Sequence, residues 1–123
     1  MIEPRVIEVF SDYVCVSSGA LVGQARIPVS PGYQVAFGER VKKAVDIKVR
    51  TVGMIADPDQ AQEIVASGRA DMVAMARAFL DNPRWVWHAA ERFGVKLDYP
   101  PPYERSRYDL WPGAKLARPR ETA

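Results

Sequence analysis

Glycine, serine and arginine residues stand at the ends of three apolar runs, where backbone amides and a guanidinium could together bind an anion. Ser17-Ser18-Gly19-Ala20 follows the first run, Gly53 lies inside the second, and Ala76-Arg77 follows the third. A phosphate group needs exposed N–H donors and a cation, and the forked guanidinium of arginine suits its oxygens. The pattern predicts a phosphate site at Gly53 and Arg77. The alternative is structural: Gly53 relieves a tight strand end, and Arg77 pairs with a helix carboxylate.

Other residue types that often carry chemistry are scarce. His88 is the only histidine, and its place on a helix between Trp85 and Trp87 indicates a boundary residue rather than a catalytic base. Cys15 lies in an apolar run and is predicted to be a small buried hydrophobe. A single cysteine excludes an internal disulfide and a cysteine metal site, and no glycine-rich dinucleotide motif or P-loop is present. No metal site is therefore expected.

The elements that would position these residues follow the order typical of parallel α/β proteins. Apolar runs at 13–16, 50–55 and 71–75 are continuous, so we expect strands buried on both faces, with a further strand possible at 6–10. Helices are predicted to begin after residue 34, at Pro58 behind an Asp57 cap, and at Pro83 behind an Asn82 cap. Their expected buried stripes are Phe37, Val41, Ala44, Val45; Ala61, Ile64, Val65; and Val86, Ala89, Ala90, Phe93. Gly68 and Gly94 end two of these helices, and Pro100–Pro102 predicts an extended segment.

Composition and charge narrow the class of protein. The 123 residues are 48% hydrophobic and 26% charged, which is typical of a folded domain. Net charge is +2, and since residues 1–102 contain 12 basic and 12 acidic residues, the excess lies in 103–123. Such a charge does not indicate nucleic acid, and no stretch suits a membrane span or a secretory signal. We expect a cytoplasmic protein whose basic tail, 98–123, is extended and partly disordered or, alternatively, binds an anionic partner.

Several short segments together resemble one family. They are Ser17–Val22, Pro31–Val35, Val52–Ile55, Gly68–Asp71, Ala76-Arg77, Asn82-Pro83 and Tyr103–Arg105. In order and spacing they resemble the carboxy-terminal third of the old yellow enzymes, in the bacterial ene-reductase branch. The resemblance runs from about residue 13 to 105, and residues 1–12 match it poorly. It implies that 13–97 form the last three βα units, strands 6 to 8, of a (β/α)8 TIM barrel.

The resemblance also implies where a cofactor binds. In this family FMN lies at the carboxyl ends of the barrel strands, with its phosphate in the loops after strands seven and eight. Those loops correspond to Gly53-Met54 and Ala76-Arg77, whose N–H groups, with the Arg77 side chain, would hold the phosphate. Ser18 and Gly19 would lie near the rim of the cofactor.

The implied chemistry is hydride transfer from NAD(P)H to FMN and then to an activated alkene. Tyr103-Glu104-Arg105 matches a Tyr-x-Arg motif that reaches a neighbouring subunit's active site, so Arg105 is the candidate catalytic residue, acting in trans. The family's substrate-binding pair and proton-donating tyrosine have no counterpart here, so we expect no turnover by this chain alone and expect a homo-oligomer or a complementing chain. Two other classes stay open: a non-catalytic phosphate-binding or interaction module built from βα units, and a basic-tailed protein that binds an anionic partner.

Overall fold

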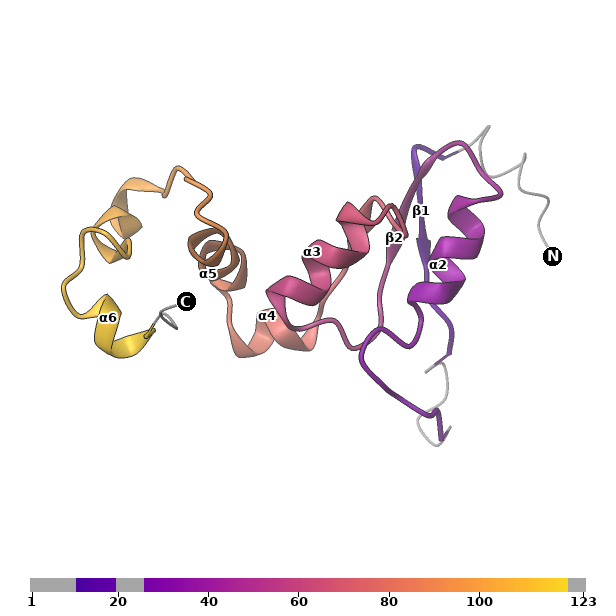
Figure 1. The fold of residues 1–123 in the computed structure, drawn as a ribbon, viewed down its shortest axis with the longest axis horizontal. Coiled ribbons are helices and arrows are strands. Elements are labelled where there is room, and N and C mark those ends of the chain that lie inside the picture. The colour runs from indigo at the N-terminus through magenta and orange to yellow at the C-terminus, as the bar shows by residue number, and fades with distance from the viewer. Residues whose placement is uncertain (1–10, 20–25, 120–123) are drawn as a thin grey trace. The chain divides into compact units, whose positions relative to one another are not determined.

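The computed structural model describes residues 11–19 and 26–119, and the strand expected at 6–10 lies outside them. The chain divides into two compact units, 1–81 and 82–123. The first unit alternates strands and helices along the chain (Figure 1). Its elements are β1 (Tyr13–Val16), α2 (Val35–Lys42), β2 (Lys48–Thr51), α3 (Pro58–Ala66), β3 (Met72–Val73) and α4 (Arg77–Asp81).

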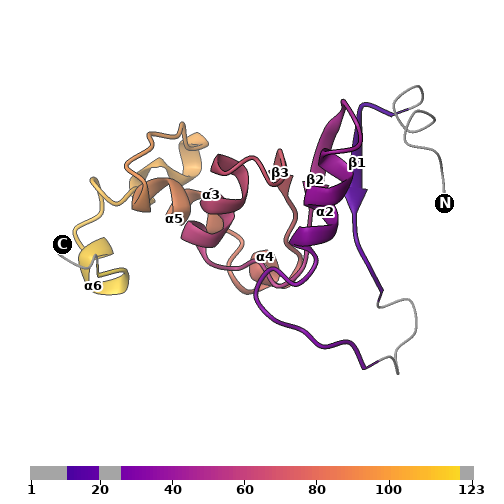
Figure 2. The ribbon, with the colours of Figure 1, turned by 45° about the vertical axis from the view of Figure 1, so that its right-hand side comes forward.

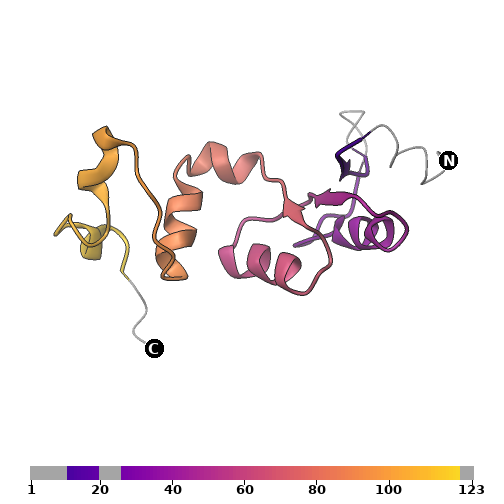
Figure 3. The ribbon, with the colours of Figure 1, turned by 90° about the horizontal axis from the view of Figure 1, so that it is seen from above.

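The three strands form one parallel sheet in the order β1-β2-β3, as the sequence predicts (Figure 2). Val16 lies opposite Thr51, and Thr51 lies opposite Val73, so the carboxyl ends of all three strands meet at one edge. Helices α2 and α3 lie on the same side of the strands (Figure 3). Successive right-handed crossovers that step in one direction across a sheet produce this single helical layer. The first unit is therefore an α/β structure built from consecutive βα units.

The core lies between the middle strand and the two helices. Val49 and Thr51 of β2 are fully buried, as are Val35 of α2 and Ile64 of α3. Helix α2 approaches β2 closely because Gly38 has no side chain: a Cβ there would lie 2.9 Å from the Thr51 Oγ1 atom. Helix α2 packs on β2 and α3 packs on β3, and the strands on either side of β2 are covered less than β2 is.

The prediction that all strands are buried on both faces is wrong. In β1 the side chains alternate between exposed and half-buried, with Tyr13 46% exposed and Cys15 exposed. Cys15 is thus not a core hydrophobe, and no element among residues 11–19 and 26–119 covers it. Strand β1 has the expected bounds, whereas the other two strands are shorter than expected. Strand β2 ends at Thr51 because the positive φ of Gly53 and Met54 turns the chain, and β3 is only Met72–Val73.

The helix-end signals predict the observed structure well. Asp57 caps α3 by accepting a hydrogen bond from the N–H of Gln60 at 3.0 Å, with Pro58 in the first position. Gly68 follows in the left-handed conformation, with φ of 76°. The buried stripes are narrower than predicted, because Phe37 of α2 and Val65 of α3 are 45% and 41% exposed. Short βα units bury only the part of each helix that faces the sheet.

The second unit contains α5 (Trp85–Arg92), the 3-10 helix η1 (Pro101–Ser106) and α6 (Ala114–Ala117). Helix α5 begins two residues later than predicted, although the Asn82 side chain does accept a hydrogen bond, from the N–H of Arg84 at 3.1 Å. Its buried residue is Ala89, whereas Val86 and Phe93 are exposed, so that part of the stripe prediction is wrong. Gly94 ends the helix region with φ of 67°.

The prediction that the proline run is extended throughout and forbids a helix is also wrong. Of the three prolines only Pro100 is extended, and Pro101 starts the 3-10 helix η1. Proline lacks an N–H but its fixed φ suits a first turn, where that donor has no partner within the helix. The N–H of Tyr103 closes the turn by donating to the Pro100 carbonyl at 2.8 Å.

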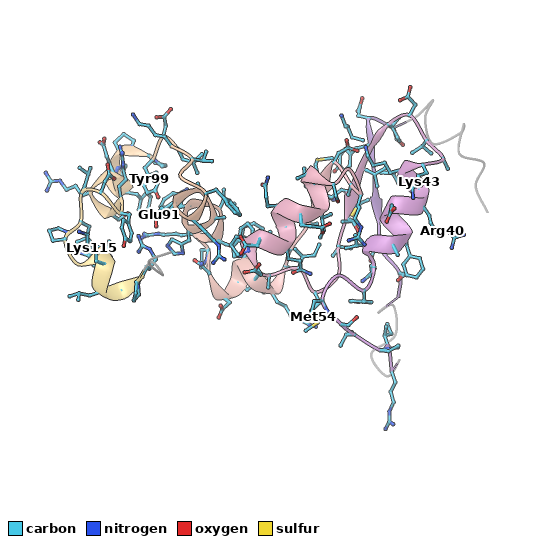
Figure 4. All side chains as sticks on the ribbon, in the orientation of Figure 1. Arg40, Lys43, Met54, Glu91, Tyr99 and Lys115 are labelled. Atoms are coloured by element: carbon cyan, nitrogen blue, oxygen red, sulfur yellow. The ribbon has the colours of Figure 1, made fainter. Side chains whose placement is uncertain are left out.

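An ion pair between Arg118 of the tail and Glu91 joins the tail to α5. Arg118 donates two hydrogen bonds to the Glu91 carboxylate, at 3.1 and 3.2 Å, and Tyr99 donates a third at 3.2 Å; Glu91 and Tyr99 are labelled in Figure 4. Trp87 stacks on Tyr99 with ring centroids 4.3 Å apart. In the part of the tail that is described, an ion pair and aromatic packing join the chain to α5. Within the described residues no helix has the length and apolar character needed to cross a bilayer.

Candidate functional site

The loops after β2 and β3 leave the sheet at the same edge. Both strands run parallel with Thr51 opposite Val73, and the N–H of Ala74 continues the pairing by donating to the Thr51 carbonyl at 2.8 Å. Gly53 lies two residues beyond this point and Arg77 lies three residues beyond Ala74. The fold therefore brings the two loops of the predicted phosphate site to neighbouring positions at the carboxyl ends of the strands.

The loop after β2 turns sharply at Gly53 and Met54. Gly53 has φ of 120° and Met54 has φ of 49°, a region that residues with a side chain seldom adopt. The Met54 carbonyl is held by the N–H of Gly32 at 3.3 Å and by Nε2 of Gln60 at 3.2 Å. In the part of the chain that is described, the N–H groups of Gly53 and Met54 donate no hydrogen bond. The turn therefore holds two adjacent backbone donors without a partner in the described residues, one in the buried Gly53 and one in the exposed Met54.

The loop after β3 carries the cation. Ala76 and Arg77 are both exposed, and the Ala76 carbonyl accepts the N–H groups of Phe79 and Leu80 as α4 begins. Among residues 11–19 and 26–119 Arg77 makes no ion pair. The structural alternative, in which Arg77 neutralises a helix carboxylate, is therefore wrong for the described part of the chain. A guanidinium without a counter-charge and backbone donors without a partner, both in loops at one edge of the sheet, are the kinds of donor that bind phosphate.

The loop after β1 reaches the same edge through a glutamine. Ser18 donates its N–H to Oε1 of Gln34, and the Gln34 side chain is buried, with 5% of the residue exposed. Gly19 follows with φ of 95°, where a Cβ would lie 2.7 Å from Cδ1 of Ile27. A Cβ added to Gly53 would lie 3.0 Å from Cβ and Cγ of Gln34. Gln34 therefore contacts both predicted loops.

Sequence reasoning missed the role of Gln34. The residue appears in the family-like segment Pro31–Val35, but no spacing rule assigns its side chain a partner. The available signal was a polar residue placed directly before the apolar face of a helix, at the end of the loop that returns from β1. Buried glutamines must have hydrogen-bond partners, so such a position indicates a loop contact.

The opposite edge of the sheet carries a fully paired carboxylate. Asp71, before β3, accepts hydrogen bonds from Nζ of Lys42 at 2.7 Å, from the N–H of Val49 at 2.9 Å and from Nζ of Lys48 at 3.3 Å. These donors, Lys42 and Val49 foremost, lower the pKa of Asp71 from 3.8 to about 2. Asp71 joins α2, β2 and β3 and has a structural role.

The remaining candidates lie in the second unit. Arg105 is an exposed residue of η1, and its role in trans stays a prediction. His88 accepts a hydrogen bond on Nδ1 from Nδ2 of Asn82 at 2.9 Å, since Oδ1 of Asn82 is occupied by the N–H of Arg84. Burial and the nearby charge of Arg118 lower the pKa of His88. His88 is half-buried, which agrees with the boundary position that the sequence predicts. No cluster of potential metal ligands is present in the described residues.

The sequence matches a family described as NADH:flavin oxidoreductase / NADH oxidase, over residues 7–94. The chain belongs to this family. It is 48% identical over 94 residues to an NADPH dehydrogenase of Geobacillus thermodenitrificans, covering 76% of this chain and 27% of that protein. An NADPH dehydrogenase of Clostridium acetobutylicum is 39% identical over 102 residues, covering 83% and 30%. An NADPH dehydrogenase of Bacillus subtilis is 42% identical over 94 residues, covering 76% and 28%.

These comparisons confirm the resemblance to the old yellow enzyme family, including its confinement to part of the enzyme. The chain spans less than a third of the length of the curated relatives it matches. The region that matches the family, residues 7–94, contains β1, β2, β3 and the loops at their carboxyl ends, whereas Arg105 lies beyond that region.

The residues present fit the anionic end of a flavin cofactor. The two loops around Gly53 and Arg77 contribute, within the described residues, two N–H groups and one guanidinium that have no partner. Two acidic side chains, Asp57 and Asp81, lie within four residues of Gly53 or Arg77 in sequence. Asp57 caps α3, and within the described residues Asp81 makes no ion pair with Arg77. At the opposite edge Asp71 accepts three hydrogen bonds, so its charge is already satisfied. Donors without a partner in the described residues therefore distinguish the carboxyl edge of the sheet from the amino edge.

Proposed function

We propose that this chain is the carboxy-terminal portion of an FMN-dependent NAD(P)H oxidoreductase, an ene-reductase, and that its loops bind the FMN phosphate. The observation that carries the proposal is the placement of open N–H donors at Gly53 and Met54 beside the strand end that leads to Arg77, which has no counter-charge among the described residues. Membership of a flavin oxidoreductase family supplies the ligand class. Ala76 contributes a backbone donor beside Arg77, and Ser18 and Gly19 form the rim.

The chain's own residues bind and orient rather than react. Backbone donors at the positive-φ turn of Gly53 and Met54 suit a compact anion, and Arg77 adds a charge-assisted, forked contact. When bound, FMN supplies the hydride chemistry that links NAD(P)H to an activated alkene. A cofactor gripped only at its phosphate is not oriented at its ring. We therefore propose that the isolated chain binds FMN without catalysing turnover.

An FMN titration with a matched arginine control tests the site. Charge-assisted hydrogen bonds contribute about 1.5–3 kcal/mol, so Arg77→Ala is expected to weaken FMN binding about ten- to hundredfold. Arg40→Ala, at an arginine of α2 away from the loops, is expected to leave the affinity unchanged. Riboflavin, which lacks the phosphate, is expected to bind weakly and equally to all three proteins. Equal losses in the two variants, or equal binding of FMN and riboflavin, would contradict the phosphate site.

A turnover assay tests the second part of the proposal. NADPH oxidation is followed with cyclohexenone, with FMN added in excess over the purified chain. No rate above the background of free FMN is expected. A rate proportional to the chain concentration would show that the residues present are sufficient for catalysis.

We also propose that the exposed side of the sheet is covered in the active enzyme by a complementing chain or another copy. Tyr13 and Cys15 are exposed there, and Arg50 stands over the Tyr13 ring with its guanidinium carbon 5.1 Å from the ring centroid. The Arg50 Nε atom is buried and has no hydrogen-bond partner in the described part of the chain. Sedimentation over a range of concentrations is expected to show association. A monomer whose sharp thermal transition does not depend on concentration would contradict it.

Arg105 is proposed to act in the active site of the neighbouring subunit. Within the assembled enzyme, Arg105→Ala is expected to lower turnover while FMN binding by this chain stays unchanged. Its position on η1, outside the unit that carries Gly53 and Arg77, makes the two effects separable. A loss of FMN affinity equal to that of Arg77→Ala would place Arg105 at the phosphate instead.

A further inference from the structure

We infer that Gln34 is a positioning residue for the cofactor site, whose buried side chain fixes the Ser18 loop and the Gly53 loop relative to each other. The inference rests on the proposed function, because these are two of the loops proposed to receive FMN. It assigns to Gln34 no contact with the cofactor. Its action is transmitted through the backbone at Ser18 and Gly53.

One half of the Gln34 side chain holds the loop after β1. Its Oε1 atom accepts the N–H of Ser18, sixteen residues earlier in the sequence. Only 5% of Gln34 is exposed, so water competes little for this bond. The carboxamide thereby sets the path of the chain immediately before Gly19, where φ is 95°.

The other half of the same side chain supports the loop after β2. A Cβ at Gly53 would lie 3.0 Å from both Cβ and Cγ of Gln34 and 3.2 Å from its backbone nitrogen. The Gly53 backbone therefore rests directly on the aliphatic part of Gln34. A displacement of that side chain moves the backbone whose N–H groups are available to the phosphate.

The backbone of Gln34 is itself held in place by hydrogen bonds at the start of α2. It is the residue before α2, and its carbonyl accepts the N–H groups of Phe37 at 3.1 Å and Gly38 at 3.4 Å. Gly32, two residues before Gln34, donates its N–H to the carbonyl of Met54 at 3.3 Å. The same segment therefore also holds the residue that follows Gly53. Met54, labelled in Figure 4, is 56% exposed, so the turn is supported by these contacts rather than by burial of its own side chain.

Glutamine suits this position for two reasons. Its carboxamide oxygen satisfies a buried N–H, and the group is neutral, so it adds no negative charge to an edge that receives an anion. Methionine has a similar length and shape without the acceptor. Gln34→Met therefore removes the bond to Ser18 while keeping the packing against Gly53.

Amide hydrogen exchange and FMN titration of the full chain together test the inference. In Gln34→Met the Ser18 amide is expected to exchange about tenfold faster, relative to the core amide of Val49, and FMN affinity is expected to fall about tenfold. Gln62→Met, at an exposed glutamine of α3, is expected to change neither quantity. Normalising to Val49 separates local loosening from a general loss of stability. Gln34→Glu keeps an acceptor and is expected to restore slow exchange at Ser18, whereas its negative charge is expected to keep FMN binding weak.

Three results would overturn the positioning role. They are an unchanged Ser18 exchange rate in Gln34→Met, a faster rate with unchanged FMN affinity, and no recovery of Ser18 protection in Gln34→Glu. Failure of the proposed function looks different, because the unsubstituted chain then binds no FMN. The exchange data from the ligand-free chain still decide whether Gln34 couples the two loops.

Discussion

Replacing Asp71 by asparagine separates the charge of this residue from its hydrogen bonding. The asparagine side chain would retain an oxygen for the N–H of Val49, which the Asp71 carboxylate accepts at 2.9 Å. The substitution removes the ion pairs with Lys42 at 2.7 Å and Lys48 at 3.3 Å. Since these contacts join α2, β2 and β3, we expect the first unit to lose stability in Asp71→Asn.

The magnitude follows from the pKa of Asp71. At about 1.4 kcal/mol per pKa unit, a fall from 3.8 to about 2 corresponds to roughly 2.4 kcal/mol. The side chain of Asp71 is 17% exposed, but that of Lys48 is 71% exposed, so solvent screens part of the interaction. With the Val49 hydrogen bond retained, we expect Asp71→Asn to lower the free energy of unfolding by about 1–2 kcal/mol at neutral pH.

The sign of the pH dependence distinguishes this mechanism from simple loss of packing. A carboxyl group whose pKa is lowered on folding contributes its full stability above pH 3.8, and this contribution is lost as the pH falls toward 2. Below that range Asp71 is neutral, as asparagine is. The unfolding free energies of the two proteins should therefore differ most near neutral pH and converge near pH 2.

Urea unfolding monitored by far-UV circular dichroism at several pH values measures the difference. Asp81→Asn, at an exposed aspartate that ends α4, provides the matched control and should show no convergence of this size. Curves for the unsubstituted chain and Asp71→Asn that stay parallel down to pH 2 would refute the electrostatic argument. Equal stability at pH 7 would refute the structural role of the ion pairs altogether.

Three further outcomes are expected. In urea unfolding, Gly53→Ala should lower the unfolding free energy by about 2–4 kcal/mol, because the new Cβ strains the backbone and clashes with Gln34. Gly68→Ala is the control: Gly68 has φ of 76° but nothing lies within 4 Å of its Cβ, so the loss should be only about 1 kcal/mol. Proton NMR of the single histidine, His88, should give a pKa below 6.5, and the unfolding free energy should fall as the pH drops from 6.5 through the measured pKa. A pKa of His88 above 6.5 would contradict its burial as a neutral side chain. Arg118→Gln should raise the pKa of His88 in the same titration and destabilise the second unit by about 2 kcal/mol, and an unchanged pKa would show that Arg118 does not act on the imidazole.

Local patterns in the sequence predict the order of elements and several of their ends. Asp57 and Pro58 start α3 and Gly68 follows it because capping and left-handed turns depend on neighbours within a few residues. The exposure of side chains cannot be predicted from local patterns in the same way. Cys15 and Phe37 are apolar residues in apolar segments, yet both are exposed because their burial depends on what packs against them. Residue type predicts burial only when a partner surface is present.

The sequence also predicts one part of the candidate site and not another. Parallel strands place Gly53 and Arg77 at one edge, and this follows from topology alone. The contacts of Gln34 that support this edge could not be predicted from the sequence, because its partners, Ser18 and Gly53, lie far apart in the chain. The family-like segments that include these residues were visible, but the contacts between segments arise only in the folded chain. Tertiary hydrogen bonds of buried amides have no local spacing rule.

The two edges of the small sheet differ in how their charges are satisfied, and this difference is the strongest physical argument for a ligand. At the amino edge Asp71 is paired with two lysines and a backbone N–H, which leaves its charge compensated within the unit. At the carboxyl edge Arg77 has no counter-charge in the described residues, and Gly53 and Met54 hold unused donors at a turn that their conformation makes costly. An anion bound at this edge would stabilise both the strained turn and the guanidinium, and this is the role that we propose for the FMN phosphate.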